Sequence, residues 1–287
     1  MKYRFMRFPE GKTKAVTFSY DDGCRQDLRT AEILNARGLK GTFNINSARI
    51  AANPGSSALS EEEIREHILG KGHEAAVHGE WHKAPGKVRP IDGIRDILNC
   101  RLDMEKRFAR IIRGMAYPDS GITAFIGQAS YEGVKNYLME LDIAYARTVG
   151  QDNNGFELPT DWYQWMPTAH HNHAKLIEWA QEFTALDVNG QYGARRNPRL
   201  FYLWGHSFEF DRDKNWDRFE TVCDILAGKE DIWYAVNMDI CAYAKAYDSL
   251  VFSADGRMVY NPGVQTIWFD DDGELCCVKA GETLVLA

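Results

Sequence analysis

Two stretches of the sequence carry acids and histidines that could hold a divalent cation. The segment AVTFSYDDG (residues 15–23) ends in the adjacent acids Asp21 and Asp22, and HGEWH places His78 and His82 four residues apart. Adjacent carboxylates repel each other, so a cation that binds one and leaves the other free would explain why both are present. An aspartate with two histidines forms a set of three ligands that leaves positions open for water and substrate.

Each stretch also has a simpler interpretation. Asp-Gly is common at tight chain reversals, and Asp255-Gly256 and the acids within TIWFDDDGELCCV (266–278) predict hairpin turns and nothing more. HGEWH could equally be a loop with two hydrogen-bonded histidines. It differs from the HExxH pattern of zincin peptidases, because Glu80 does not directly follow His78. The surrounding elements must decide between a site and a turn.

Strand patterns alternate with helical patterns along most of the chain. We expect strands at 16–20, 41–45, 74–77, 111–115, 143–148, 162–166, 200–204 and 232–236, helices at 27–37, 60–69, 90–108, 131–141, 174–185, 216–226 and 237–247, and a polar loop at 150–160. This alternation implies an α/β fold with a mainly parallel sheet, and its length predicts an irregular, TIM-like (β/α) barrel of seven or eight strands. We therefore predict a catalytic barrel over residues 1–248 and a small C-terminal β module over 249–287, where short strands and Asp-Gly turns replace helices.

Four of the predicted strand ends carry unusual polar residues. They are the two acids after the first strand, the two histidines after the third, the segment RGMAYP (113–118) at the fourth, and His206 after a late strand. Ligands of parallel α/β sheets lie at the carboxyl ends of the strands. One polar strand end is ordinary, whereas four on one rim favour a binding or catalytic site.

In their order and separation, these segments resemble the motifs of the polysaccharide deacetylase family (carbohydrate esterase family 4). Its TF-DDG motif is similar to TFSYDDG (17–23), its His-x-x-x-His motif to HGEWH (78–82), its Arg-led motif to RGMAYP (113–118), and its strand ending in histidine to LWGH (203–206). The resemblance covers about residues 14–206, which is most of the predicted barrel.

The resemblance implies one divalent metal ion, usually zinc, with cobalt, nickel or manganese as alternatives. Its ligands would be Asp22, His78 and His82. A metal ion lowers the pKa of bound water towards ~7 and polarises an acyl oxygen, which suits hydrolysis of an amide.

The resemblance also implies roles for the neighbouring residues. Asp21 would be the general base, and Arg113 would pair with it and keep it ionised. The backbone around Tyr117 would help to stabilise the tetrahedral oxyanion. His206 would protonate the leaving amine, and Asp161 is the candidate carboxylate beside it.

The sequence departs from the family's pattern at several positions. Cys24 follows the acids where the family commonly has proline, and Gly79 stands where Ser or Thr usually follows the first histidine. The third motif is rearranged, and the family's Asp-Trp motif corresponds only loosely to Asp161-Trp162. These changes leave the predicted metal ligands intact, so they affect the inference about the substrate rather than the one about the metal.

The reaction implied by the resemblance is removal of an N-linked acetyl group from an amino sugar or glycan. One alternative is hydrolysis of another small non-peptide C–N amide on the same fold. A second alternative is a catalytically inactive protein that binds glycans.

Two further groups of residues have more than one interpretation. His170, His171 and His173 could form a second metal site, or line the pocket and its polar loop. Four tryptophans could stack against sugar faces or pack in the core; they are Trp81, Trp162, Trp165 and Trp204.

Composition and charge limit the partners. The chain has 287 residues, a formal net charge of −7 and no Lys/Arg-rich run, which argues against nucleic acid or an anionic membrane as the main partner. No stretch resembles a signal peptide or a membrane span, and the six cysteines form no CxxC pair, so we expect a cytoplasmic protein with reduced thiols. The expected partner is an N-acetylated sugar or small amide, and the oligomeric state is left open.

Overall fold

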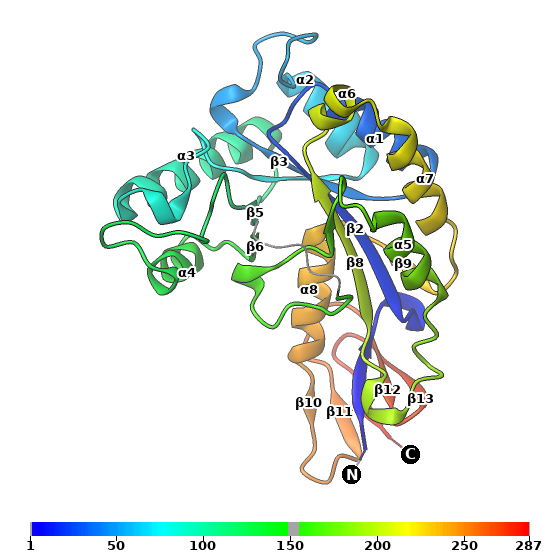
Figure 1. The fold of residues 1–287 in the computed structure, drawn as a ribbon. Coiled ribbons are helices and arrows are strands. Elements are labelled where there is room, and N and C mark those ends of the chain that lie inside the picture. The colour runs from blue at the N-terminus through cyan, green and yellow to red at the C-terminus, as the bar shows by residue number, and fades with distance from the viewer. Residues whose placement is uncertain (1, 149–154, 287) are drawn as a thin grey trace.

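The computed structural model describes residues 2–148 and 155–286, and a curled parallel sheet lies at its centre (Figure 1). Seven strands follow the order β6-β5-β4-β3-β2-β8-β7, and β9 pairs with the first half of β2. The strands are β2 (Lys14–Asp21), β3 (Gly41–Ile45), β4 (Glu74–Val77), β5 (Gly114–Ala116), β6 (Tyr145–Arg147), β7 (Ala169–His170), β8 (Arg199–Gly205) and β9 (Ile232–Tyr234). The sheet forms part of a barrel, and the α/β barrel fold predicted from the sequence is confirmed.

Helices cover the outside of the curled sheet, as Figure 1 shows. They are α1 (Asp27–Ala36), α2 (Glu61–Glu63) with the π-helical turn Ile64–Ile68, α3 (Pro90–Phe108), α4 (Tyr131–Glu140), α5 (Leu176–Ala185), α6 (Phe208–Asp213), α7 (Trp216–Leu226) and α8 (Asn237–Asp248). The capping box expected at Ser60 is present, because Ser60 Oγ accepts from the Glu63 N–H at 3.2 Å and Glu63 Oε2 accepts from the Ser60 N–H at 2.9 Å.

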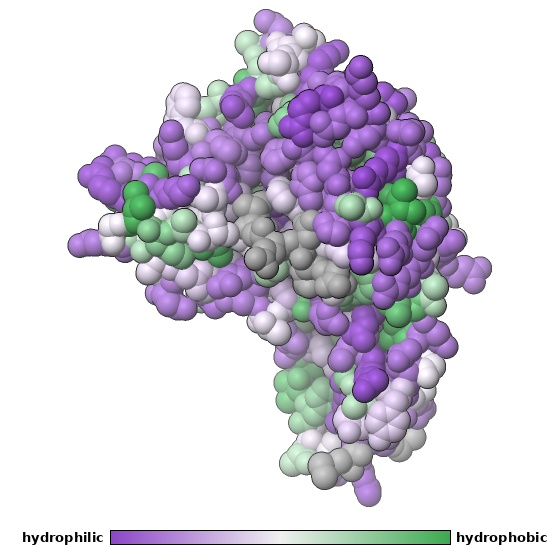
Figure 2. All heavy atoms as spheres, viewed as in Figure 1, coloured by the Kyte–Doolittle hydropathy of each residue, from purple (hydrophilic) through white to green (hydrophobic). Residues whose placement is uncertain are grey.

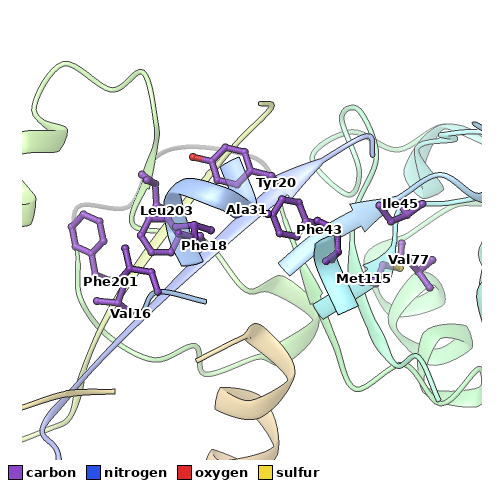
Figure 3. Packing of buried hydrophobic residues seen from close by; sticks show 14 of the residues in the cluster. Val16, Phe18, Tyr20, Ala31, Phe43, Ile45, Val77, Met115, Phe201 and Leu203 are labelled. Atoms are coloured by element: carbon purple, nitrogen blue, oxygen red, sulfur yellow. The ribbon is translucent and has the colours of Figure 1, made fainter. Parts of the chain in front are cut away.

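Strand β2 separates an apolar layer from a polar interior, because successive side chains of a strand point to opposite faces. Val16, Phe18 and Tyr20 are buried in the main hydrophobic core, which Figure 3 shows in close view. Thr17 and Ser19 are also buried but hydrogen-bond to other polar side chains, Asn237 at 2.8 Å and Asn44 at 2.8 Å. The interior of the partial barrel is therefore a hydrogen-bonded polar layer that leads to Asp21.

The C-terminal β module consists of two small antiparallel sheets, β1-β12-β13 and β10-β11-β14. Its strands are β1 (Arg4–Arg7), β10 (Val251–Phe252), β11 (Met258–Tyr260), β12 (Ile267–Asp271), β13 (Glu274–Val278) and β14 (Thr283–Val285). The N-terminal strand β1 pairs with β12, so residues 4–7 lie with this module, which a division at residue 249 does not capture.

One predicted strand is absent, and one predicted loop is only partly described. Residues 162–166 form a short 3-10 helix (Trp162–Gln164) followed by a single bridge between Trp165 and Arg147. The Asp161 carboxylate accepts from the Tyr163 N–H at 2.9 Å, which favours the helical turn over an extended chain. The first half of the predicted loop at 150–160 lies outside the described residues.

The surface in Figure 2 is mostly hydrophilic, with hydrophobic residues in small separate groups on this face. Within residues 2–148 and 155–286, none of the helices has the length and apolar character that crossing a membrane requires.

Candidate metal centre and active site

Asp22, His78 and His82 converge at the carboxyl edge of the sheet. Asp22 directly follows β2, and both histidines lie on the loop after β4. Asp22 Oδ1 lies 3.8 Å from His78 Nε2 and 3.5 Å from His82 Nε2, and the three ligand atoms are within 4.8 Å of one another. Tetrahedral zinc ligands lie roughly 3.4 Å apart for metal–ligand distances near 2.1 Å, so this spacing suits one ion.

The hydrogen bonds of His78 leave one ring nitrogen available for a cation. Its Nδ1–H donates to the Ala116 carbonyl at 2.9 Å, which fixes the tautomer and puts the lone pair on Nε2. His78 Nε2 and Asp22 Oδ1 are both buried and have no hydrogen-bond partner among the residues that the structure describes. Buried polar atoms normally have partners, so these two atoms fit a divalent ion.

Two of these three residues have an uncommon backbone conformation. Asp22 has φ +81° and His82 has φ +57°, in the left-handed region that residues other than glycine rarely adopt. Such conformations cost free energy and concentrate at functional sites.

Gly79 allows the histidine loop to approach helix α3. A Cβ at Gly79 would lie 2.2 Å from Asp96 Oδ2, and the glycine has φ +76°. Asp96 is nearly buried and accepts from the Trp81 N–H at 2.7 Å, so it holds the loop between the two histidines. The glycine that departs from the family's pattern is therefore required here by the contact with Asp96.

Asp21 is buried beside the metal-ligand set and keeps a negative charge. Arg147 Nη2 donates to both carboxylate oxygens, at 2.6 Å to Oδ1, and Asn44 Nδ2 donates to Oδ1 at 2.8 Å. Burial by itself raises the pKa of Asp21, but the charges of Arg147, His78 and His206 bring it below its usual value. Asp21 is therefore ionised at neutral pH.

The predicted pairing of Arg113 with Asp21 is wrong. Arg113 directly precedes β5, at the amino end of that strand, and its guanidinium binds Asp142 Oδ1 at 2.6 Å. Arg147 lies instead at the carboxyl end of the neighbouring strand β6, in register with Ala116. The sequence signal that could have found it is an arginine at the carboxyl end of a predicted strand.

Tyr117 does not offer its amide to a reacting group. Its N–H donates to the Arg147 carbonyl at 2.9 Å, its side chain is buried, and its hydroxyl donates to the Tyr163 carbonyl at 3.0 Å. The next residue, Pro118, has no N–H to donate. The Tyr117 N–H is therefore already engaged, and an oxyanion role for the rest of the backbone around Tyr117 stays a prediction.

His206 lies between Asp21 and a carboxylate that the sequence did not indicate. Its Nε2 is 4.0 Å from Asp21 Oδ2, and its Nδ1 is 3.7 Å from Glu209 Oε1. Burial lowers the pKa of His206, but Glu209, Asp21 and Asp22 outweigh burial and raise it overall. The expected neighbour Asp161 instead accepts from Lys135 at 2.7 Å, so Glu209, three residues after His206, takes its place.

The predicted histidine cluster divides in the structure. The Nε2 atoms of His170 and His171 lie 3.1 Å and 2.9 Å from Glu209 Oε2, whereas His173 stacks on Trp179 at 4.2 Å. Burial raises the pKa of Glu209, but the adjacent imidazoles of His170, His171 and His206 hold that pKa well below its usual value. Glu209 is thus an ionised carboxylate surrounded by imidazoles.

A pocket of about 500 Å³ opens beside the metal-ligand set, and its lining residues are Asp22, Cys24, Arg49, Ser57, Ala58 and Phe208. Burial raises the pKa of Cys24 well above its usual value, so this thiol is neutral and unsuited to attack as a nucleophile.

Trp81, beside His82, is 64% exposed, while Trp165 is buried in the core.

The curled parallel sheet and its helices have the (β/α)-barrel architecture of polysaccharide deacetylases. Residues 8–134 match the family model "Polysaccharide deacetylase", so the resemblance seen in the sequence motifs is confirmed. No curated protein matches the chain significantly.

Solved structures share the fold at low sequence identity. A putative polysaccharide deacetylase from Mycobacterium smegmatis has 18% identity and a TM-score of 0.54, covering 84% of this chain and 93% of that one. A probable polysaccharide deacetylase from Pseudomonas aeruginosa PAO1 has 13% identity and a TM-score of 0.56, covering 82% and 92%. Puue allantoinase has 14% identity and a TM-score of 0.56, covering 82% and 91%. At these identities the likeness concerns the fold.

Proposed function

We propose that this protein is a metal-dependent hydrolase that removes an N-linked acetyl group from an amino sugar or glycan. The observation that carries the proposal is a pair of buried atoms, His78 Nε2 and Asp22 Oδ1, that have no hydrogen-bond partner in the described part of the chain and lie beside the ionised carboxylate of Asp21. A hydrolase of this class needs both a cation site and a free base within reach of it.

Asp22, His78 and His82 would hold one divalent ion, with zinc as the first choice and cobalt, nickel or manganese as alternatives. When bound, such an ion supplies Lewis acidity, which makes water a nucleophile near neutral pH and polarises the acyl oxygen. The fixed tautomer of His78 directs Nε2 to this site without rearrangement.

Asp21 would act as the general base and accept the proton of the attacking water at a carboxylate oxygen. Arg147 is a positioning residue: it holds the carboxylate through both oxygens and keeps it ionised, while its guanidinium lies 4.6 Å from the centre of the Trp204 ring. Because Arg147 is fully buried, this contact is not weakened by solvent.

His206 would act as the general acid and donate a proton from Nε2, the ring nitrogen on the side of Asp21, to the leaving amine. Glu209 lies on the Nδ1 side and would orient the ring, as a carboxylate does for a catalytic histidine. The base and the acid then lie at the carboxyl ends of two strands that pair directly, because Asp21 ends β2 and His206 follows β8.

The exposed ring of Trp81 beside His82 supports a sugar as substrate, because aromatic rings stack on apolar sugar faces. A second candidate is another small non-peptide amide. The TM-score of Puue allantoinase equals that of the Pseudomonas deacetylase, so the fold is as compatible with this candidate as with the first.

The test measures acetate release from N-acetylated sugars and oligomers, and hydrolysis of small amides including allantoin, with metal content determined on the same sample. His78→Ala should lose the tightly bound ion and the activity, and Asp21→Asn should keep the ion but lose roughly 10²–10⁴-fold in turnover. His173→Gln, on a histidine outside the site, is the control. Full turnover by His78→Ala would overturn the proposal, and sugar binding without hydrolysis would favour an inactive glycan-binding protein.

A further inference from the structure

A second group of metal-ligating side chains lies at the same edge of the sheet. His170 ends β7, His206 follows β8, and Glu209 lies in the first turn of α6. One ligand atom from each of these residues lies within 4.8 Å of the other two. We propose that His170, His206 and Glu209 form a second binding site for a zinc-like divalent cation, distinct from the site of Asp22, His78 and His82.

The spacing of this second group matches that of the first. Glu209 Oε2 lies 3.1 Å from His170 Nε2, and Glu209 Oε1 lies 3.7 Å from His206 Nδ1. The corresponding distances from Asp22 are 3.5 Å and 3.8 Å. The two distances of the second group bracket the roughly 3.4 Å expected between tetrahedral ligands, and the two of the first group lie just above it, so a cation fits either group without large movement.

The donor chemistry is also the same in the two groups. Each combines one carboxylate with two imidazoles, a set that suits zinc, copper, nickel and cobalt better than magnesium or calcium. All three residues are partly exposed, while the atoms His206 Nδ1 and Glu209 Oε2 are buried and have no hydrogen-bond partner among the described residues, which suits a bound cation.

His171 packs against the carboxylate of this site from behind. Its ring is buried, and its Nε2 lies 2.9 Å from Glu209 Oε2. A Cβ at Gly205 would lie 2.1 Å from His171 Nδ1, so a glycine is needed for the ring to reach this position. Residues behind a metal ligand that orient it typically contribute 10–100-fold to affinity.

One positive side chain competes with a cation here. Arg212 Nη2 lies 3.4 Å from Glu209 Oε1, but the side chain is 58% exposed and also binds Asp213 at 2.8 Å. An exposed ion pair contributes little, so Arg212 can turn towards Asp213 when a cation binds. We therefore expect weaker binding at this site than at the first.

A cation at the second site would change the chemistry of His206. This consequence rests on the proposed function, in which His206 is the general acid. A ring that coordinates a cation through Nδ1 cannot hold the second proton that makes it a general acid near neutral pH. Excess zinc should therefore inhibit the enzyme after the first equivalent has activated it. Whether the second site binds a cation does not depend on the reaction that the enzyme catalyses.

The test titrates the metal-free protein with Zn²⁺ by calorimetry. The wild type should bind two equivalents with different affinities. His170→Gln should lose the weaker one, with affinity falling by about 100-fold or more, because a direct ligand contributes at least as much as a residue behind it. His173→Gln, in the same loop, should keep both, and His78→Ala should keep only the weaker one.

A second measurement locates the ion. Anomalous scattering at the zinc edge, from crystals soaked in excess Zn²⁺, should give a peak between His170 and Glu209 in the wild type and none in His170→Gln. A single equivalent in the wild type, or two in both His170→Gln and Glu209→Gln, would overturn the second site. Two equivalents in a protein that hydrolyses no substrate of the panel would leave this site standing and overturn the proposed function.

Discussion

The two adjacent acids at the end of β2 differ in their surroundings. Asp21 points into the polar interior, where it is 1% exposed and accepts hydrogen bonds from Arg147 and Asn44. Asp22 begins the turn, with φ +81°, and its carboxylate faces the histidine loop. One acid is thereby fixed as a charged, hydrogen-bonded group, while Oδ1 of the other has no hydrogen-bond partner among the described residues, lies 3.6 Å from Arg49 Nη1 and is turned towards the site of the cation.

Replacing Arg147 should change the pH dependence of catalysis. In Arg147→Gln the buried Asp21 loses its positive partner, so its pKa rises and the acidic limb of the kcat/KM profile moves to higher pH. Each unit of this movement lowers activity on the acidic side by about tenfold. Arg147→Lys keeps a positive charge and should therefore show a smaller shift than Arg147→Gln. Arg113→Gln should show the wild-type profile. An unchanged limb in Arg147→Gln would show that Asp21 is not the titrating base.

Replacing His206 should affect amides far more than esters. An amine is a poor leaving group unless it is protonated, whereas the leaving group of an activated ester needs no proton. His206→Ala should therefore lose roughly 10²-fold or more on an N-acetyl substrate and much less on an activated acetyl ester. Steady-state kinetics on both substrates, with the zinc of the first site quantified, would check this. Equal losses on the two substrates would assign His206 another role.

At the scale of elements, His73 joins the start of β3 to the turn before β4. The ring is buried, and its Nδ1 accepts from the Gly41 N–H at 3.0 Å. Burial and the nearby charge of Lys40 lower the pKa of His73 to about 4. The neutral ring is thus the form that the folded sheet requires.

This histidine should make stability depend on pH. Between pH ~6.5 and ~4 the unfolded chain binds a proton at His73 that the folded chain does not, so stability is complete above this window and falls by up to about 3 kcal/mol through it. Urea unfolding at several pH values should show a shallower fall in His73→Gln, whose amide oxygen can accept from Gly41 without titrating. Parallel curves for the two proteins would contradict the assignment.

At the scale of the whole molecule, a buried charge cluster ties the N-terminal strand to the C-terminal module. Asp270 on β12 accepts from Arg7 on β1 at 3.1 Å and from Arg196 in the segment before β8. Arg7 and Asp270 are 1% and 3% exposed. The two ends of the chain are thereby held together, and Figure 1 shows both termini near β12 and β13.

Breaking this cluster should reduce stability without changing the chemistry. Asp270→Asn leaves two arginines without their buried carboxylate and should lower the free energy of unfolding by about 3–5 kcal/mol. Asp272→Asn, on the exposed turn of the same hairpin, should change it by less than about 0.5 kcal/mol. Denaturant unfolding gives both values, and kcat per folded molecule should match the wild type. A small effect of Asp270→Asn would mean that β1 is held by its strand pairing alone.

The sequence by itself indicated most of the strands and helices, the parallel sheet and the grouping of Asp22 with His78 and His82, but it missed β7 and α6 and placed a strand at 162–166. These features depend on local periodicity, on the Ser60 capping box and on the rule that ligands lie at carboxyl strand ends. The individual elements and motifs are local patterns, and the rule about carboxyl strand ends brings the motifs together without knowledge of the detailed packing.

Only the tertiary structure decided which side chains meet. Arg147 lies 126 residues from Asp21, and it replaces Arg113 because the register of β5 and β6 puts it opposite Ala116. The pairing of β1 with β12 likewise joins segments more than 260 residues apart. Glu209 was close to His206 in sequence, yet its role depends on the three histidines that fold around it. Such contacts follow from strand order, register and the direction of side chains, which are set by packing across the whole chain.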